Sequence, residues 1–104
     1  TQLDECLKSA QEAFKDKSNN QLILQSLECA AGLYESNQAE LMSLAMREAG
    51  KTYQDAIDEV REAVDFLRYY AKLAPKIIHN KREALGVFVC ISPWNFPLAI
   101  FTGQ

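Results

Sequence analysis

Apolar residues recur at intervals of three and four along most of the chain. The first stripe comprises Leu3, Cys6, Leu7, Ala10 and Phe14, and the second comprises Ile23, Leu27, Ala30 and Tyr34. A polar interruption at 18–20 separates these two stripes. Further stripes occupy 39–49 and 53–74, and the last of these comprises Ile57, Val60, Val64, Leu67 and Ala71. This spacing puts each set on one face of a helix, so the pattern predicts four helices.

Polar residues and glycine mark the predicted helix ends. Asn37 with Glu40, and Thr52 with Asp55, have the three-residue spacing of a capping box, in which each partner bonds a free backbone N–H group. Gly50 is suited to the position just after a helix. Pro75 is predicted to end the long helix, because proline lacks the N–H group that the helix needs. Residues 76–83 are then predicted to be a connector.

Charge is confined to residues 1–83, and residues 84–104 carry none. Within the uncharged part, the run from Leu85 to Ile91 is apolar without alternation and rich in β-branched and aromatic residues. Such a run predicts a strand buried on both faces, whose hydrogen-bond partners come from missing sequence or from a second copy. Pro93 and Pro97 argue against a membrane helix here, because lipid offers no partner for the freed backbone groups.

The predicted fold is therefore mainly α, with four helices and one buried strand. Residues 1–83 form the helical part, and residues 84–104 contribute the strand, a turn and the start of a further helix. A single strand cannot complete a sheet, and the chain begins with Thr1 rather than an initiator methionine. Both features predict that these residues belong to a longer protein.

Composition narrows the class of protein. A chain of 104 residues with 48% hydrophobic and 24% charged residues fits one globular domain and excludes disorder throughout. The net charge of −3 offers no basic patch for nucleic acid. His79 is the single histidine, so no multi-histidine metal site is expected. The three cysteines, Cys6, Cys29 and Cys90, are odd in number and lack metal-ligand spacing, which favours reduced, packed thiols in a cytoplasmic protein.

The segment Ser92-Pro93-Trp94-Asn95-Phe96-Pro97 is the strongest candidate for chemistry. It follows the predicted strand, and ligands of α/β proteins bind beyond the carboxyl ends of strands. The Asn95 side chain offers an uncharged N–H donor, which suits the stabilisation of an oxyanion. Asparagine is also a good helix cap, and the residues by themselves favour that interpretation.

Two motifs resemble those of a known family. The segment Ile91-Ser92-Pro93-Trp94-Asn95-Phe96-Pro97 resembles the hallmark of the NAD(P)-dependent aldehyde dehydrogenase superfamily. Residues 47–51, Arg-Glu-Ala-Gly-Lys, are similar to the Glu-x-Gly-Lys helix end of that family. The longer blocks 47–71 and 90–104 resemble its bifunctional proline-catabolic branch, proline utilization A.

The resemblance implies a parent α/β fold with a Rossmann-type parallel sheet. It implies that Asn95 holds the oxyanion and that Phe96 lines the aldehyde pocket. The implied wall of the NAD site consists of Ile91, Ser92, Pro93 and Trp94. The implied reaction oxidises L-glutamate γ-semialdehyde to L-glutamate, with the catalytic cysteine and glutamate downstream, so residues 1–104 alone are expected to be inactive. An FAD-dependent proline dehydrogenase domain upstream also fits this branch.

A second interpretation belongs to a different class of protein. Residues 1–104 would then be a free-standing helical interaction module that docks on a partner through its apolar carboxyl-terminal strand. In both interpretations the uncharged segment 84–104 favours association between copies of the chain, with no nucleic-acid or membrane partner. A reading frame that continues with a cysteine motif would favour the dehydrogenase.

Overall fold

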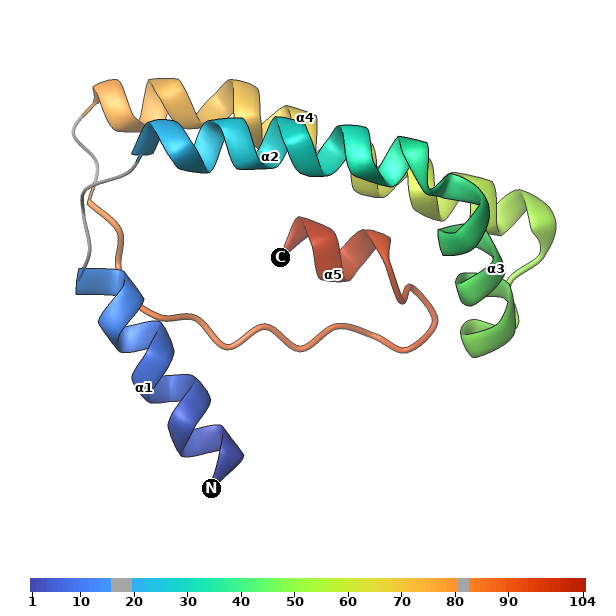
Figure 1. The fold of residues 1–104 in the computed structure, drawn as a ribbon, viewed down its shortest axis with the longest axis horizontal. Helices are drawn as coiled ribbons and strands as arrows, with labels where there is room; N and C mark the ends of the chain where they lie inside the picture. Colours follow the sequence, from blue (N-terminus) through green and yellow to red (C-terminus); the bar gives the residue numbers. More distant parts are fainter. Residues whose placement is uncertain (16–19, 81–82) are drawn as a thin grey trace.

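The computed structural model describes residues 1–15, 20–80 and 83–104. These residues contain five helices: α1 (Gln2–Lys15), α2 (Asn20–Ser36), α3 (Gln38–Ala49), α4 (Tyr53–His79) and α5 (Ala99–Gly103). Helices α2 and α4 lie side by side and run in opposite directions (Figure 1). Helix α3 joins them at one end, and α5 packs on α4 beneath this layer.

The core lies between α2 and α4. Ala31 of α2 meets Val64 and Leu67 of α4, and Leu27 and Tyr34 pack around them. The buried face of α4 comprises Ala56, Glu59, Val60, Ala63, Val64, Leu67 and Ala71. The predicted apolar stripe of this helix is therefore confirmed, except that a glutamate lies within it. Small residues at the contact allow the two helices to approach closely, and the buried aliphatic area provides the hydrophobic stabilisation.

The predicted ends of α3 and α4 are confirmed in part. Gly50 follows α3 with φ 63°, in the left-handed region that glycine adopts without strain. Thr52 caps α4, since its Oγ1 accepts the Asp55 N–H at 3.1 Å. The capping box at Asn37 is wrong in one respect: Asn37 occupies the N-cap position, but its side chain makes no cap bond. Its Nδ2 instead donates to the Leu33 carbonyl at 2.8 Å, so it stabilises the end of α2.

The prediction that Pro75 ends the long helix is wrong. Helix α4 continues through Pro75 to His79, so residues 76–79 are helical rather than part of a connector. Proline at this position removes one hydrogen bond, to the carbonyl four residues earlier, and leaves the later N–H groups able to continue the helix. Of the predicted connector, residues 81–82 lie outside the described residues, as do positions 18 and 19 of the predicted interruption.

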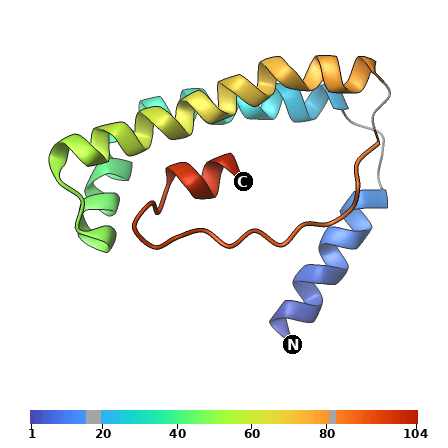
Figure 2. The ribbon, with the colours of Figure 1, turned by 180° about the vertical axis from the view of Figure 1, so that it is seen from behind.

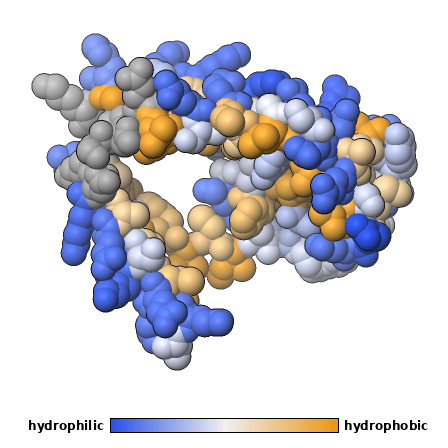
Figure 3. Space-filling model, in the orientation of Figure 1, coloured by the Kyte–Doolittle hydropathy of each residue, from blue (hydrophilic) through white to orange (hydrophobic). Residues whose placement is uncertain are grey.

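The prediction of a buried strand at Leu85–Ile91 is also wrong for the chain as described. Residues 83–91 are extended, but the described residues contain no strand, because no other segment pairs with this one. Leu85 is 90% and Ile91 84% exposed, and Cys90 is exposed rather than packed in a core. Figure 3 shows apolar atoms along this segment and an opening between it and the helices.

Helix α1 lies outside the layer formed by α2 and α4. It extends away from the α2–α4 layer in both views of the ribbon, and within the described residues it packs on no other helix (Figure 2). Its predicted stripe is therefore uncovered, with Leu3 68% exposed. Cys6 and Cys29, predicted to pack in the interior, are exposed as well. Among the described helices, none combines the length and apolar character that crossing a membrane requires.

Thr52 makes a side-chain cap bond and Asn37 does not, so their replacement should have different effects on stability. We expect Thr52→Ala to lower the free energy of unfolding by about 1 kcal/mol, because it removes a side-chain cap bond from α4. Asn37→Ala removes only an exposed bond to a carbonyl, and its expected cost is below about 0.5 kcal/mol. Urea unfolding of the chain followed by circular dichroism measures both. An equal loss in the two variants would contradict the difference in capping seen here.

Candidate functional site

The segment Ser92–Pro97 forms a turn that joins the extended residues to α5. Within it, the Phe96 N–H donates to the Pro93 carbonyl at 3.4 Å, and helix α5 begins two residues after Pro97. Ser92 Oγ donates to Gln104 Oε1 at 2.7 Å, so both ends of the stretch 92–104 are held together. The turn and α5 therefore form one compact unit that lies against α4.

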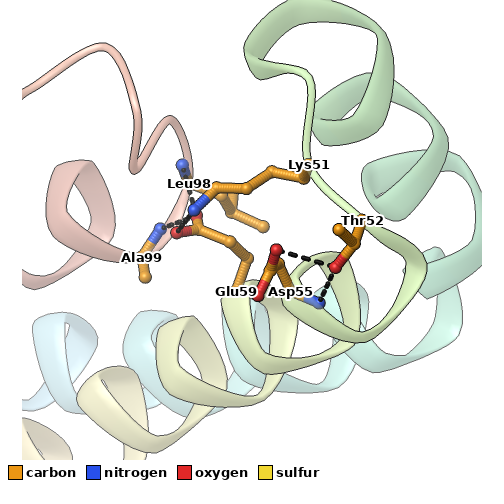
Figure 4. A network of polar contacts seen from close by, with 6 residues as sticks. All are labelled: Lys51, Thr52, Asp55, Glu59, Leu98 and Ala99. Carbon is orange, nitrogen blue, oxygen red and sulfur yellow. Dashed lines mark hydrogen bonds and ion pairs between the residues drawn. The ribbon is translucent and has the colours of Figure 1, made fainter.

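A buried glutamate of α4 attaches this unit to the helical layer. Glu59 is 2% exposed, and its Oε2 accepts the N–H groups of Leu98 and Ala99, each at 3.0 Å. Figure 4 shows the carboxylate pointing from α4 to the start of α5. These amides have no partner within the helix, and a carboxylate at a helix N-terminus also interacts favourably with the helix dipole. Glu59 is thus the cap of α5, supplied from another helix.

This arrangement excludes the helix-cap interpretation of Asn95. The N-cap position of α5 is Leu98, and no side chain of the turn bonds the first amides of the helix. The hydrogen bonds of the turn involve Ser92, Phe96, Leu98 and Ala99. None of those between described residues involves the side chain of Asn95, which is exposed.

Lys51 connects Glu59 with the turn. Its Nζ lies 3.6 Å from Glu59 Oε1 and 4.1 Å from the centroid of the Phe96 ring. The first distance is that of an ion pair rather than a hydrogen bond, and Oε1 has no hydrogen-bond donor among the described residues. Both charges are largely removed from water, with the Lys51 side chain 13% exposed, so their attraction is screened less than at the surface. The ammonium over the ring is a cation–π contact.

Two exposed carboxylates support the surrounding helices. The pKa of Asp55 is lowered because the Thr52 hydroxyl donates to it, which reinforces the cap beside Lys51. The pKa of Glu35 is lowered by its hydrogen bonds from Arg68, at 2.8 and 2.7 Å, which join α2 to α4. Because both pKa values lie below those of the unfolded chain, these contacts contribute stability near neutral pH that is lost as the pH falls.

The other predicted site residues are consecutive apart from Asn95, and all but the half-buried Ser92 are exposed. Ile91 and Trp94 are 84% and 78% exposed, and Phe96 is 40% exposed with its ring against Lys51. Two cavities lie elsewhere: one of about 610 Å³ between α3 and the start of α4, and one of about 410 Å³ beside α5. Neither cavity is lined by residues of the turn. No group of three acidic, histidine or cysteine side chains in the described part could hold a metal.

Neither Glu59 nor its ion pair with Lys51 was predicted from the sequence. One signal was present, since Glu59 falls between Ala56 and Ala63 on the apolar face of α4 rather than on the charged face. An acidic residue in an apolar stripe requires a partner when buried. Its partners, the amides of Leu98 and Ala99, lie about forty positions away in the sequence, and no spacing rule connects them.

The model of the aldehyde dehydrogenase family matches residues 1–104, so the chain belongs to this family.

Its relatives include bifunctional proteins and single dehydrogenases. The chain is 61% identical over 79 residues to the "Bifunctional protein PutA" of Klebsiella aerogenes, which covers 75% of the chain and 6% of that protein. It is 58% identical over 76 residues to the protein of the same name from Escherichia coli, covering 72% of the chain and 6% of the relative. The "1-pyrroline-5-carboxylate dehydrogenase" of a Geobacillus strain is 36% identical over 115 residues, and the match covers 96% of the chain and 22% of that protein. The chain thus spans a small part of each relative.

Mutation of Lys51 measures how much its positive charge contributes to the stability of the fold. We expect Lys51→Met to lower the free energy of unfolding by about 2 kcal/mol, since it leaves the buried Glu59 charge without a cation. This value lies below the range for a wholly isolated charge because two backbone N–H groups still bond Glu59.

The double variant Lys51→Met/Glu59→Gln shows how much of the loss in Lys51→Met comes from the unpaired negative charge of Glu59. Removing the carboxylate charge as well should recover part of the loss, as measured by denaturant unfolding. The single variant Glu59→Gln completes the comparison. If the losses of the two single variants simply add in the double variant, then the two residues do not interact.

Proposed function

We propose that this chain is part of an NAD-dependent dehydrogenase that oxidises L-glutamate γ-semialdehyde to L-glutamate in proline catabolism. The names of its relatives support this substrate, and the observation that carries the reaction is the free carboxamide of Asn95. It is exposed at a turn whose following helix is capped by another residue. The alternative of a free-standing interaction module does not account for family similarity along all of residues 1–104.

In this proposal Asn95 stabilises negative charge on the substrate. Attack by a nucleophile on an aldehyde carbon moves an electron pair onto the carbonyl oxygen. The side-chain N–H of Asn95 donates to that oxygen, and the bond strengthens as the charge develops. An amide suits this role because it donates without releasing a proton. Phe96 lies next to Asn95 and supplies an apolar surface for the carbon chain of the aldehyde.

The residues before Asn95 fit a dinucleotide wall. Ile91, Ser92, Pro93 and Trp94 form an uncharged, consecutive run that ends at Asn95, and Trp94 exposes most of its ring. They would hold the nicotinamide end of NAD, which accepts a hydride when bound. Pro93 and Pro97 restrict the backbone on both sides, so the position of the wall relative to Asn95 is constrained.

The wider setting of the chain also forms part of the proposal. Residues 1–83 would be the helical amino-terminal segment of the dehydrogenase domain, and residues 84–104 the entry into its NAD-binding part. The odd number of cysteines, Cys6, Cys29 and Cys90, is the feature of the sequence that favours a reducing, cytoplasmic location.

The role of Asn95 is tested in a complete dehydrogenase that carries this segment. We expect Asn95→Ala to lower kcat by about 10²–10³-fold, with a much smaller change in NAD binding, because one oxyanion donor is lost. Asn95→Asp should be at least as damaging, since a carboxylate repels the developing charge. Steady-state kinetics with L-glutamate γ-semialdehyde, together with NAD titration, provides the measurement.

Melting temperature controls for folding in both variants. Asn95 makes no hydrogen bond within the described residues, so both variants are expected to unfold near the temperature of the parent protein. A folded Asn95→Asp variant with near-normal kcat would remove Asn95 from the reaction.

We also propose that copies of residues 1–104 associate through the segment 84–91. Five of its residues are large and apolar, and all five are 42% exposed or more: Leu85, Val87, Phe88, Val89 and Ile91. An uncharged apolar surface of this length favours burial against another copy. Sedimentation velocity of the chain is expected to show dimers or larger species as concentration rises.

A pair of matched variants locates the contact. Val89→Lys places a charge in the segment and should shift the association to concentrations at least about tenfold higher, equivalent to 1.4 kcal/mol. Leu3→Lys places the same charge on exposed α1 and should leave the association unchanged. A chain that is monomeric at all concentrations, or equal effects of the two variants, would contradict this proposal.

A further inference from the structure

Asn95 directly precedes two points at which the chain is held, one by Lys51, just before α4, and one by Glu59 of α4. The Phe96 ring lies against Lys51 Nζ at 4.1 Å. Two and three residues after Phe96, the N–H groups of Leu98 and Ala99 are bonded by Glu59. Pro93 and Pro97 restrict φ within the same six residues. The backbone that follows Asn95 is therefore held by two charged residues that make no hydrogen bond to the Asn95 side chain among the described residues.

Lys51 and Glu59 are in turn held by the first turns of α4. Lys51 immediately precedes the cap residue Thr52, which bonds the Asp55 N–H, and Glu59 lies two turns along the helix on its buried face (Figure 4). Their own ion pair at 3.6 Å keeps both side chains directed at the turn. A rigid helix start is thus connected to Asn95 through one cation and one anion.

From this geometry we infer that Glu59 is a positioning residue for Asn95, an inference that rests on the proposed function. Its carboxylate orients the backbone from which the Asn95 carboxamide projects, so it acts through Asn95 and without contact with substrate. Hydrogen-bond donors stabilise an oxyanion only when they are aimed before the charge forms. A displacement of about 1 Å in such a group is enough to lower the rate by about 10²-fold.

The chemistry of the contact predicts a graded response to substitution. In Glu59→Gln, the amide oxygen still accepts the two N–H bonds, but the neutral acceptor is weaker and the NH₂ group faces the Lys51 ammonium. In Glu59→Met, the side chain keeps approximately the same length and shape, but the N–H groups of Leu98 and Ala99 lose their acceptor. The matched control is Glu62→Gln, the same chemical change on the exposed face of α4.

Kinetics of a complete dehydrogenase that carries this segment test the inference. We expect Glu59→Gln to lower kcat by about 10-fold and Glu59→Met by about 100-fold, with KM for the aldehyde changed less than about 3-fold. Glu62→Gln should retain the parent kcat. Melting temperature identifies any loss of folded protein, and Glu59→Gln, which keeps the acceptor, provides the test if Glu59→Met fails to fold.

A double-variant cycle separates positioning from general stability. If Glu59 acts through Asn95, then adding Glu59→Gln to Asn95→Ala should lower kcat by less than about 3-fold further, because the donor that it aims is already absent. Independent, multiplicative losses would overturn the inference and assign Glu59 to the fold alone. Folded Glu59 variants with parental kcat would overturn it as well.

Amide hydrogen exchange provides a readout that does not depend on the reaction. Exchange of the peptide containing Leu98 and Ala99 should be faster in Glu59→Met by at least about 10-fold and little changed in Glu62→Gln. Unchanged exchange would overturn the positioning role even if activity fell. An Asn95→Ala variant with normal kcat would instead overturn the proposed oxyanion role, and exchange would still decide whether Glu59 holds the turn.

Discussion

The carboxylate of Glu59, buried on α4 and bonded to the Leu98 and Ala99 amides, joins the two parts of this molecule. Without it, the only described links from α5 to the helical layer are apolar packing on α4 and the Tyr34–Thr102 contact at 3.3 Å. Burial of a charge is unfavourable unless partners replace water. The start of α5 supplies two unpaired N–H groups, and Lys51 supplies the opposite charge. The two N–H groups and Lys51 thus stabilise the buried carboxylate, and the carboxylate gives the N–H groups the acceptor that they lack within the helix.

The same contact links structure to the candidate chemistry. Since Glu59 bonds the first amides of α5, no residue of the turn is needed as a cap, and the Asn95 carboxamide stays free. A polar side chain that is exposed, unbonded and placed on a restrained backbone is suited to donate to a charge that forms during a reaction. The chain belongs to the aldehyde dehydrogenase family, and in the proposed reaction such a donor would stabilise the oxyanion. The adjoining run from Ile91 to Trp94 then provides an uncharged surface beside it.

Exposed apolar side chains follow one another most closely in the segment 84–91, and others lie on the helices, α1 included. Leu85, Phe88 and Ile91 face solvent, as does Leu3, and within the described residues neither segment packs against the core between α2 and α4. That core contains small side chains and no large one that is fully buried. The stability of the described fold therefore depends on the α2–α4 contact and the Glu59 network more than on a large interior, and the exposed Glu35–Arg68 pair adds little.

Local sequence was sufficient for the helices and for several of their ends. The spacing of apolar residues predicted α1 to α4, and the capping pattern at Thr52 and the glycine at position 50 were confirmed, because these features depend on neighbours within four positions. The Pro-Trp-Asn-Phe-Pro motif likewise identified the family. Local rules failed where a distant partner decides the outcome. An apolar run at Leu85–Ile91 becomes a strand only beside another strand, and the described residues supply none. The role of Glu59 and the freedom of Asn95 were decided by the tertiary structure alone, because the partners of a buried charge are chosen by proximity in space and not by spacing in the chain.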